Sequence, residues 1–193
     1  MRPTRDKLTP GEWALLGLLD EKAAHGFALA RAMAPDGDVG RIWSMRRTMV
    51  YSALDNLEQW ALVQPKATVP SDSGPRRTIL EATTSGIAAL NDWLHEPVER
   101  VRDVRSLLML KLLFLTRRGQ NVAPLLSRQR EVFTAQARRL AAAAEDAAGF
   151  DHALLLWRLH NTRAVIEFTN AMLIDPAPST ADLRSSSLSV DRG

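Results

Sequence analysis

The 193-residue sequence contains no cysteine. This absence excludes disulfide bonds, thiolate nucleophiles, zinc fingers and iron–sulfur clusters together. Long apolar runs are also missing: the longest, residues 107–115, is nine residues long and contains Lys111, whereas a membrane-spanning helix needs about 20. The first residues are polar and lack the apolar stretch of a secretory signal. We therefore expect a cytoplasmic protein that has no membrane partner.

The sequence also lacks the motifs of common enzyme classes. It has no glycine-rich phosphate loop, no serine elbow and no His-Glu-x-x-His zinc motif. Its histidines are scattered, and His152 and His160 fall about 80° apart around a helix, which is poor spacing for a metal site. The sequence therefore predicts a protein that is not an enzyme and that holds no metal or cofactor.

Neither sign of charge is in large excess, since the net charge is only +3. Residues 1–96 contain 11 Lys and Arg against 12 Asp and Glu, whereas residues 97–193 contain 14 against 10. The total charge is therefore weak evidence for a nucleic-acid partner, and local clusters matter more. Apolar residues make up 46% and charged residues 24%, an ordinary globular composition that predicts one medium domain or two small ones.

The first half of the sequence predicts three short helices. Residues 9–12, Thr-Pro-Gly-Glu, form a capping box before an apolar run that ends near Lys22. A helix over residues 26–33 and a Pro-Asp-Gly loop follow, and the next helix runs from Ser44, as its N-cap, to about Trp60. One stripe of this third helix is apolar at helical spacing: Val50, Leu54, Leu57 and Ala61.

A hairpin and a fourth helix complete this half. Two short strands, residues 62–64 and 76–80, flank a loop over residues 67–75 that is rich in Pro, Gly and Ser. A helix follows from Thr83 as its cap and is closed by Pro97. Three short helices with a two-stranded wing form a winged helix-turn-helix. We therefore expect a mostly α protein with a DNA-binding domain over residues 1–97.

The second half is helical throughout its pattern, with helices predicted over residues 103–116, 122–148 and 150–173. The last helix is apolar on two sides and needs covering on both, so a second copy of the chain is implied. We expect an all-helical dimerisation domain over residues 98–174 and a disordered tail over residues 175–193. The predicted dimer interface is Leu126, Phe133, Leu140, Leu154, Trp157, Val165, Phe168 and Met172.

Basic residues gather at the start of the third helix. Residues 41–52 hold three arginines and no acid, together with hydroxyl side chains that can bond base edges or phosphates. The hairpin adds three basic residues against one acid, Asp72. A solvated helix face and an ordinary turn are the structural alternatives. The candidate DNA-contacting residues are Arg41, Ser44, Arg46, Arg47, Thr48, Tyr51, Ser52, Lys66, Arg76 and Arg77.

Five tryptophans are many for this length. Tryptophans can line a small-molecule pocket, but they more often belong to a core or an interface. Trp93 and Trp157, near the junction of the two halves, are the candidates for an effector pocket.

The ordered motifs resemble the PadR family of bacterial transcriptional regulators over residues 8–173. LTPGEWALLGLL at residues 8–19 is similar to its opening helix, and HGFAL at 25–29 to the start of its second helix. Trp43-Ser44 and VYSALDNLE at 50–58 match its recognition helix, and TTSG at 83–86 follows the wing. RSLL at 105–108 and KLLF at 111–114 resemble the longer subfamily with a helical C-terminal domain.

The sequence departs from the family pattern in three places. Phe27 replaces a usual Tyr, and Ala61 stands where the family usually has Gly at the end of the recognition helix. Ile79 and Leu80 occupy wing positions that are often aromatic.

The resemblance implies a homodimeric repressor that binds double-stranded DNA at an inverted repeat and is released by a small aromatic effector. Two alternatives stay open from the residues alone. One is a helical protein-interaction module without DNA binding, because the C-terminal helices are strongly apolar. The other is a small-molecule sensor with a pocket lined by tryptophan.

Overall fold

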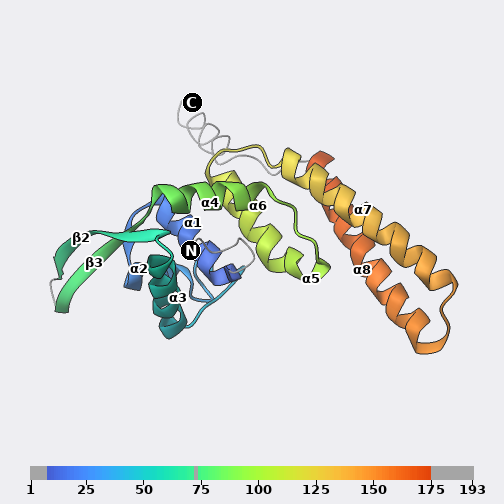
Figure 1. The fold of residues 1–193 in the computed structure, drawn as a ribbon, viewed down its shortest axis with the longest axis horizontal. Helices are drawn as coiled ribbons and strands as arrows, with labels where there is room; N and C mark the ends of the chain where they lie inside the picture. The colour runs from blue at the N-terminus through green and yellow to red at the C-terminus, as the bar shows by residue number, and fades with distance from the viewer. Residues whose placement is uncertain (1–7, 72–73, 175–193) are drawn as a thin grey trace, which may run out of the picture. The chain divides into compact units, whose positions relative to one another are not determined.

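The computed structural model describes residues 8–71 and 74–174. The chain divides into two compact units between Leu94 and His95. The tail predicted to be disordered, residues 175–193, lies outside the described residues. The first unit contains α1 (Pro10–Glu21), β1 (Ala24–His25), α2 (Gly26–Ala32), α3 (Arg47–Gln59), β2 (Val63–Ser71), β3 (Gly74–Ala82) and α4 (Thr84–His95) (Figure 1).

The second unit is helical in the part of the chain that the structure describes. It contains α5 (Val101–Asp103), a π-helical turn η2 (Val104–Leu108), α6 (Met109–Arg117), α7 (Ala123–Glu145) and α8 (Gly149–Ile174). A winged first unit followed by a helical second unit confirms the predicted fold class.

The predicted start of α1 is confirmed in atomic detail. The side chain of Thr9 accepts from the backbone N–H of Glu12 at 3.3 Å, and Glu12 accepts from the backbone N–H of Thr9 at 2.7 Å. The second carboxylate oxygen of Glu12 accepts from Asn56 Nδ2 at 3.1 Å. This buried carboxylate therefore both caps α1 and ties it to α3.

The start of α3 differs from the prediction. The helix begins at Arg47 with Arg46 as N-cap, so Ser44 is not the cap. The backbone N–H of Met45 donates to the carbonyl of Met33 at 2.9 Å, and the Met45 side chain packs against Gly11. These contacts hold the segment before α3 against α1 and the end of α2, which outweighs the N-cap preference of serine.

The apolar stripe of α3 faces the core of the first unit, but one predicted member, Ala61, is not part of it. Val50, Leu54 and Leu57 are buried as predicted, and Ala53 joins them. Ala61 is exposed and lies beyond the helix in the left-handed region, with φ of 53°. The stripe leaves the opposite face of α3 in solvent.

The wing is longer than the sequence predicted. Strands β2 and β3 pair antiparallel from Val63 opposite Ala82 to Ser71 opposite Gly74, so most of the predicted loop over residues 67–75 is strand. The sheet order is β1-β3-β2, which makes β2 an edge strand. Its register shifts fall next to Pro65 and at Pro70, and prolines are tolerated at such irregularities on an edge. The short strand β1 was not predicted.

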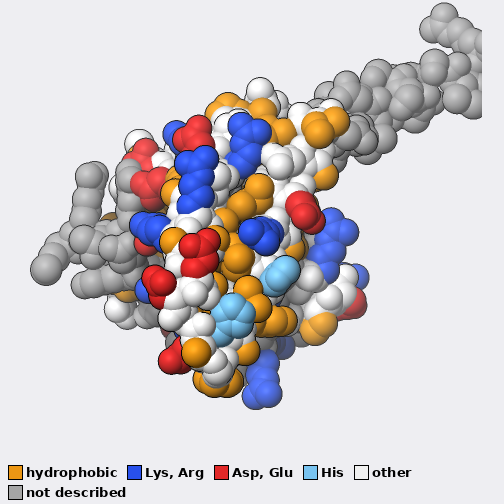
Figure 2. Space-filling view, turned by 90° about the vertical axis from the view of Figure 1, so that its right-hand side faces the viewer, with side chains coloured by type: hydrophobic (Ala, Val, Ile, Leu, Met, Phe, Trp, Pro, Cys, Tyr) orange, Lys and Arg blue, Asp and Glu red, His pale blue; other side chains and the backbone are white. Residues whose placement is uncertain are grey.

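Helices α7 and α8 pack side by side in the second unit (Figure 1). Gly149, with φ of 59°, makes the turn between them. The buried residues of α8 are Leu159, Thr162 and Thr169, so most of its apolar side chains keep exposed surface. Figure 2 looks at the α7–α8 end and shows hydrophobic side chains interleaved with charged ones.

Candidate nucleic-acid interface

The exposed face of α3 carries most of the predicted DNA-contacting residues. Val50, Leu54 and Leu57 fix the helix to the core, and the geometry of a helix then turns the remaining positions outward. The basic and hydroxyl residues predicted for this face are all exposed. They are Arg46, Arg47, Thr48, Tyr51 and Ser52, with Arg41 and Ser44 exposed in the segment before the helix.

The first turn of α3 can also receive an anion. Arg46 makes no side-chain capping hydrogen bond within the described part of the chain. The free N–H groups and the dipole at such a helix start favour phosphate.

The start of α2 lies against the first turns of α3. A Cβ at Gly26 would lie 2.6 Å from Cε1 of Tyr51, so the Tyr51 ring would have to move if any other residue stood there. The guanidinium of Arg47 lies 5.3 Å from the ring centroid of Phe27 and 5.7 Å from that of Tyr51. Arg47 therefore interacts with one ring from each helix.

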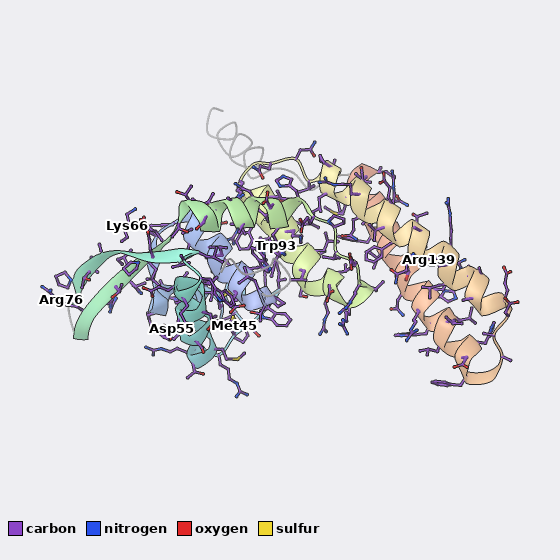
Figure 3. The ribbon with its side chains drawn as sticks, in the orientation of Figure 1. Met45, Asp55, Lys66, Arg76, Trp93 and Arg139 are labelled. Atoms are coloured by element: carbon purple, nitrogen blue, oxygen red, sulfur yellow. The ribbon has the colours of Figure 1, made fainter. Side chains whose placement is uncertain are left out.

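A groove separates α3 from the wing. It is lined on one side by Arg47, Tyr51, Asp55 and Glu58 and on the other by Arg76, Arg77 and Thr78, with His25 and Phe27 also present. Asp55 lies on α3 and Arg76 on the hairpin (Figure 3). The groove thus combines three guanidinium groups with two carboxylates. This mixed charge weakens non-specific attraction to phosphate and favours contacts with hydrogen-bonding partners of defined position.

Lys66 is less available than the sequence suggested. Its ammonium lies 2.8 Å from a carboxylate oxygen of Glu81, an acid on β3 that the prediction left out of the hairpin. Hydrogen bonds from Lys66 and then Gln64 hold the pKa of Glu81 below its ordinary value. Glu81 therefore partly neutralises the basic charge of the wing. Asp72, the acid counted in the prediction, lies outside the described residues.

The two effector-pocket candidates lie in different units. Trp93 is buried and stacks on Trp13 with ring centroids 4.7 Å apart, so it belongs to the core of the first unit, which corrects the prediction. Trp157, in the second unit, is 68% exposed and lines a cavity. Its neighbours there include Arg100, Arg102, Gln136 and Asn161.

Two residues of the predicted dimer interface are used inside the chain. Leu126 and Phe133 are fully buried in the second unit and present no surface to another chain. The other six keep surface: Leu140, Leu154, Trp157, Val165, Phe168 and Met172.

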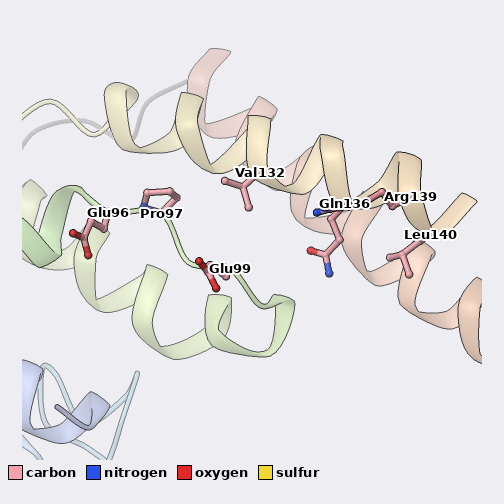
Figure 4. Close-up of a pocket in the computed structure, with 7 residues that line it drawn as sticks. All are labelled: Glu96, Pro97, Glu99, Val132, Gln136, Arg139 and Leu140. Atoms are coloured by element: carbon pink, nitrogen blue, oxygen red, sulfur yellow. The ribbon is translucent and has the colours of Figure 1, made fainter. Parts of the chain in front are cut away.

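The second unit has a further cavity, which sequence reasoning did not find. It is lined by Glu96, Pro97, Glu99, Val132, Gln136, Arg139 and Leu140 (Figure 4). The Oε1 atom of Gln136 is buried and has no hydrogen-bond partner among the described residues.

Metal-binding clusters and membrane-spanning helices are both absent from the described ranges. Residues 8–71 and 74–174 include no group of three His, Asp or Glu side chains placed to hold a metal ion. Within the same ranges, every helix is too short or too polar to cross a membrane.

Phe27, Asp55 and Glu58 are groove residues that the sequence reasoning missed. Helical spacing places Asp55 on the exposed face of α3, but it does not show that the wing lies opposite. The His25-Gly26 pair is the one local signal, because glycine at a helix start can mark a close approach.

No family model and no curated protein matches the chain. In structure it is similar to Bacillus subtilis PadR in complex with operator DNA, with 24% identity over 84% of this chain and 97% of that one and a TM-score of 0.41. It is similar to smu.1604c from Streptococcus mutans, with 17% identity, coverages of 86% and 99% and a TM-score of 0.41. A third likeness is the PadR-like transcriptional regulator BC1756 from Bacillus cereus, with 16% identity, coverages of 86% and 96% and a TM-score of 0.37.

Proposed function

We propose that the chain is a PadR-like transcriptional regulator that binds double-stranded DNA in the cytoplasm. The observation that carries this proposal is the exposed face of α3, where Arg46, Arg47, Thr48, Tyr51 and Ser52 are all in solvent. A 13-residue helix is about 20 Å long and fits the major groove, where such side chains can bond base edges. The proposal assigns DNA binding to residues 1–97.

The wing supports this assignment because it places Arg76 and Arg77 across the groove from α3. Phosphate contacts from such residues fix the register of a protein on the duplex but carry no sequence information. In this arrangement α3 reads bases, and the wing arginines hold the flanking backbone.

The proposal includes a homodimer formed through residues 98–174. Leu154, Trp157, Val165, Phe168 and Met172 share one side of α8 at helical spacing and all keep exposed surface, and a contiguous exposed apolar surface marks an interaction site. A two-fold dimer would present two α3 helices to successive major grooves, about 34 Å apart. The matching operator is an inverted repeat.

The proposal also includes repression, and a small aromatic effector whose binding releases the protein from DNA. The cavity beside Trp157 supports it, because an indole face lies with Arg100 and Arg102 among its lining residues. Titrating the full chain with a panel of aromatic compounds tests this step. Quenching of tryptophan fluorescence that Trp157→Leu abolishes supports the site, and a flat response across the panel rejects it.

Selection of bound sequences from a random duplex pool tests DNA recognition without knowledge of the target gene. The selection needs near-physiological salt and excess competitor DNA, because backbone affinity alone depends on salt. Enrichment of an inverted repeat with half-sites about 10 bp apart supports the proposal. A pool that stays random through repeated rounds rejects it.

Sedimentation equilibrium of the full chain tests the dimer separately. A monomer at micromolar concentration rejects self-association. The exposed side of α8 would then favour the alternative function, a module that binds a different protein.

A further inference from the structure

Phe27 lies on the surface, where its apolar ring has no core to fill. It is 51% exposed, at the second residue of α2. Tyr51, one turn into α3, is 40% exposed. The guanidinium carbon of Arg47 is within 6 Å of both ring centroids, the range of a cation–π interaction.

Local contacts of α2 hold Phe27 in this place. Nδ1 of His25 accepts the backbone N–H of Ala28 at 3.1 Å, which caps α2. The His25 ring also lies 6.3 Å from the Phe27 ring, at an interplanar angle of 28°. Gly26 leaves the space that the Tyr51 ring occupies. Three consecutive residues, 25–27, therefore build the surroundings of Arg47 from outside α3.

The rings affect how Arg47 can bind. They attract the charged group and limit the rotamers of a long side chain, while the N–H donors of a guanidinium lie in its plane and stay available. A fixed fork of donors suits O6 and N7 of guanine, whose positions in the major groove are fixed. A phosphate can be approached from many directions and gains less from a fixed donor.

We propose that Phe27 is a positioning residue that, with Tyr51, orients Arg47 to read one guanine in each half-site. This inference rests on the proposed function, since it needs a DNA sequence that the chain selects. It assigns base preference to a residue on α2 as well as to the recognition helix.

A double-mutant cycle on the selected duplex tests the inference, with affinities from fluorescence anisotropy. Phe27→Leu keeps an apolar side chain without an aromatic ring, and Phe27→Tyr keeps the ring. We expect Phe27→Leu to weaken binding about three- to fivefold, the size of an exposed cation–π interaction, and Phe27→Tyr to restore it. With Arg47→Ala already present, Phe27→Leu should have no further effect.

Base preference is the readout that a merely structural role would not move. Phe27→Leu and Arg47→Ala should relax the preference for guanine at the same position of the half-site. Ile87→Ala on α4 is the matched control, since Ile87 is another exposed apolar residue of the first unit, at 38%, and should leave affinity and preference unchanged.

The outcomes separate this inference from the proposed function. Equal losses from Phe27→Leu with and without Arg47 would overturn the positioning role. Loss of affinity without loss of base preference would overturn guanine reading and indicate a phosphate contact. A chain that selects no sequence at all would overturn the proposed function itself, and this inference with it.

Discussion

At the scale of single residues, Ala61 just after α3 adopts a left-handed backbone conformation that is unfavourable for a residue with a Cβ. The backbone N–H groups of Leu62 and Ala61 donate to the carbonyls of Leu57 and Glu58, both at 2.9 Å, which is the Schellman pattern. Ala61 holds its left-handed position and is the one non-glycine residue with positive φ among those described. Thr83 and Ser85 donate to its carbonyl at 2.7 and 2.9 Å, which fixes the conformation.

Ala61→Gly should therefore stabilise the protein. Glycine avoids the Cβ clash of the left-handed region, and we expect the free energy of unfolding to rise by about 1 kcal/mol. Urea denaturation of the full chain measures this change. An unchanged or lower midpoint would contradict the strain assigned to Ala61.

Lys111 predicts a dependence of stability on pH. Burial lowers the pKa of its ammonium to about 7, against the opposing effect of the Glu96 charge, and Nζ donates to the carbonyl of Glu96 at 2.8 Å. The unfolded chain keeps its proton to about pH 10. Between these values the unfolded state binds more protons, so stability should rise with pH by up to about 1.4 kcal/mol per unit. Below pH 7 both states are protonated and this contribution is constant.

Lys111→Met isolates that titration. Methionine does not titrate, so the difference between the two stability profiles reports the titration of Lys111. Urea unfolding at pH 6, 7.5 and 9 should give a rising profile for the natural chain and a flatter one for the variant. Parallel profiles would contradict the lowered pKa.

At the scale of elements, the wing is a strand pair whose charge is partly cancelled by its own residues. Glu81→Gln removes the acid that pairs with Lys66 and keeps the shape of the side chain. We expect tighter binding to the selected duplex and a steeper dependence of log affinity on log salt, by up to about 0.9 for one added phosphate contact. Glu131→Gln on α7 changes the net charge equally at an exposed position. Identical effects of the two variants would show that Lys66 gains no contact.

The side chain of Gln129 ties helix α7 to the segment before α5. The amide of the buried Gln129 donates to the carbonyl of Val98 and accepts its N–H, both at 2.7 Å. Gln129→Leu would leave both backbone groups unpaired and should cost about 2–4 kcal/mol in unfolding free energy. Gln136→Leu, two turns along α7, removes an oxygen that is already unpartnered and should cost much less. Equal losses in urea denaturation would contradict this reading.

Local sequence signals predicted most helices and strands but not how these elements pack against one another. The capping box at Thr9 and the cap at Thr83, whose Oγ1 accepts the N–H of Gly86 at 3.0 Å, depend on neighbours three residues away and were therefore predictable. The Ser44 cap failed because Met45 bonds to Met33, a contact between elements. The strand over residues 67–71 was missed because Pro70, with Ser71 after it, resembles a loop until edge pairing is known.

In the candidate site too, features set by local sequence were predictable and contacts between elements were not. The exposed face of α3 followed from its helical period. The roles of Phe27 and Glu81 could not be predicted in this way. Phe27 contacts Arg47 from α2, and Glu81 on β3 pairs with Lys66 on β2. Trp93 was misplaced because a tryptophan in the sequence cannot be assigned to a core or a pocket without its stacking partner.

At the scale of the whole molecule, the two units have different surfaces. The first unit exposes arginines and hydroxyls on α3, and the second exposes apolar side chains along α8. We assign DNA binding to the first and self-association to the second. Changes in one unit should therefore leave the property of the other intact.

The most direct test of this account compares two arginine pairs on the full chain. Arg46→Ala with Arg47→Ala removes the basic start of α3, and Arg138→Ala with Arg139→Ala removes the same charge from an exposed pair on α7. Affinity for the selected duplex should fall at least about tenfold for the α3 pair, since specific arginine contacts are each worth about 1–3 kcal/mol. The α7 pair should bind nearly as the natural chain does, and sedimentation should show the same dimer for both. Equal affinities of the two double variants would contradict DNA recognition by α3.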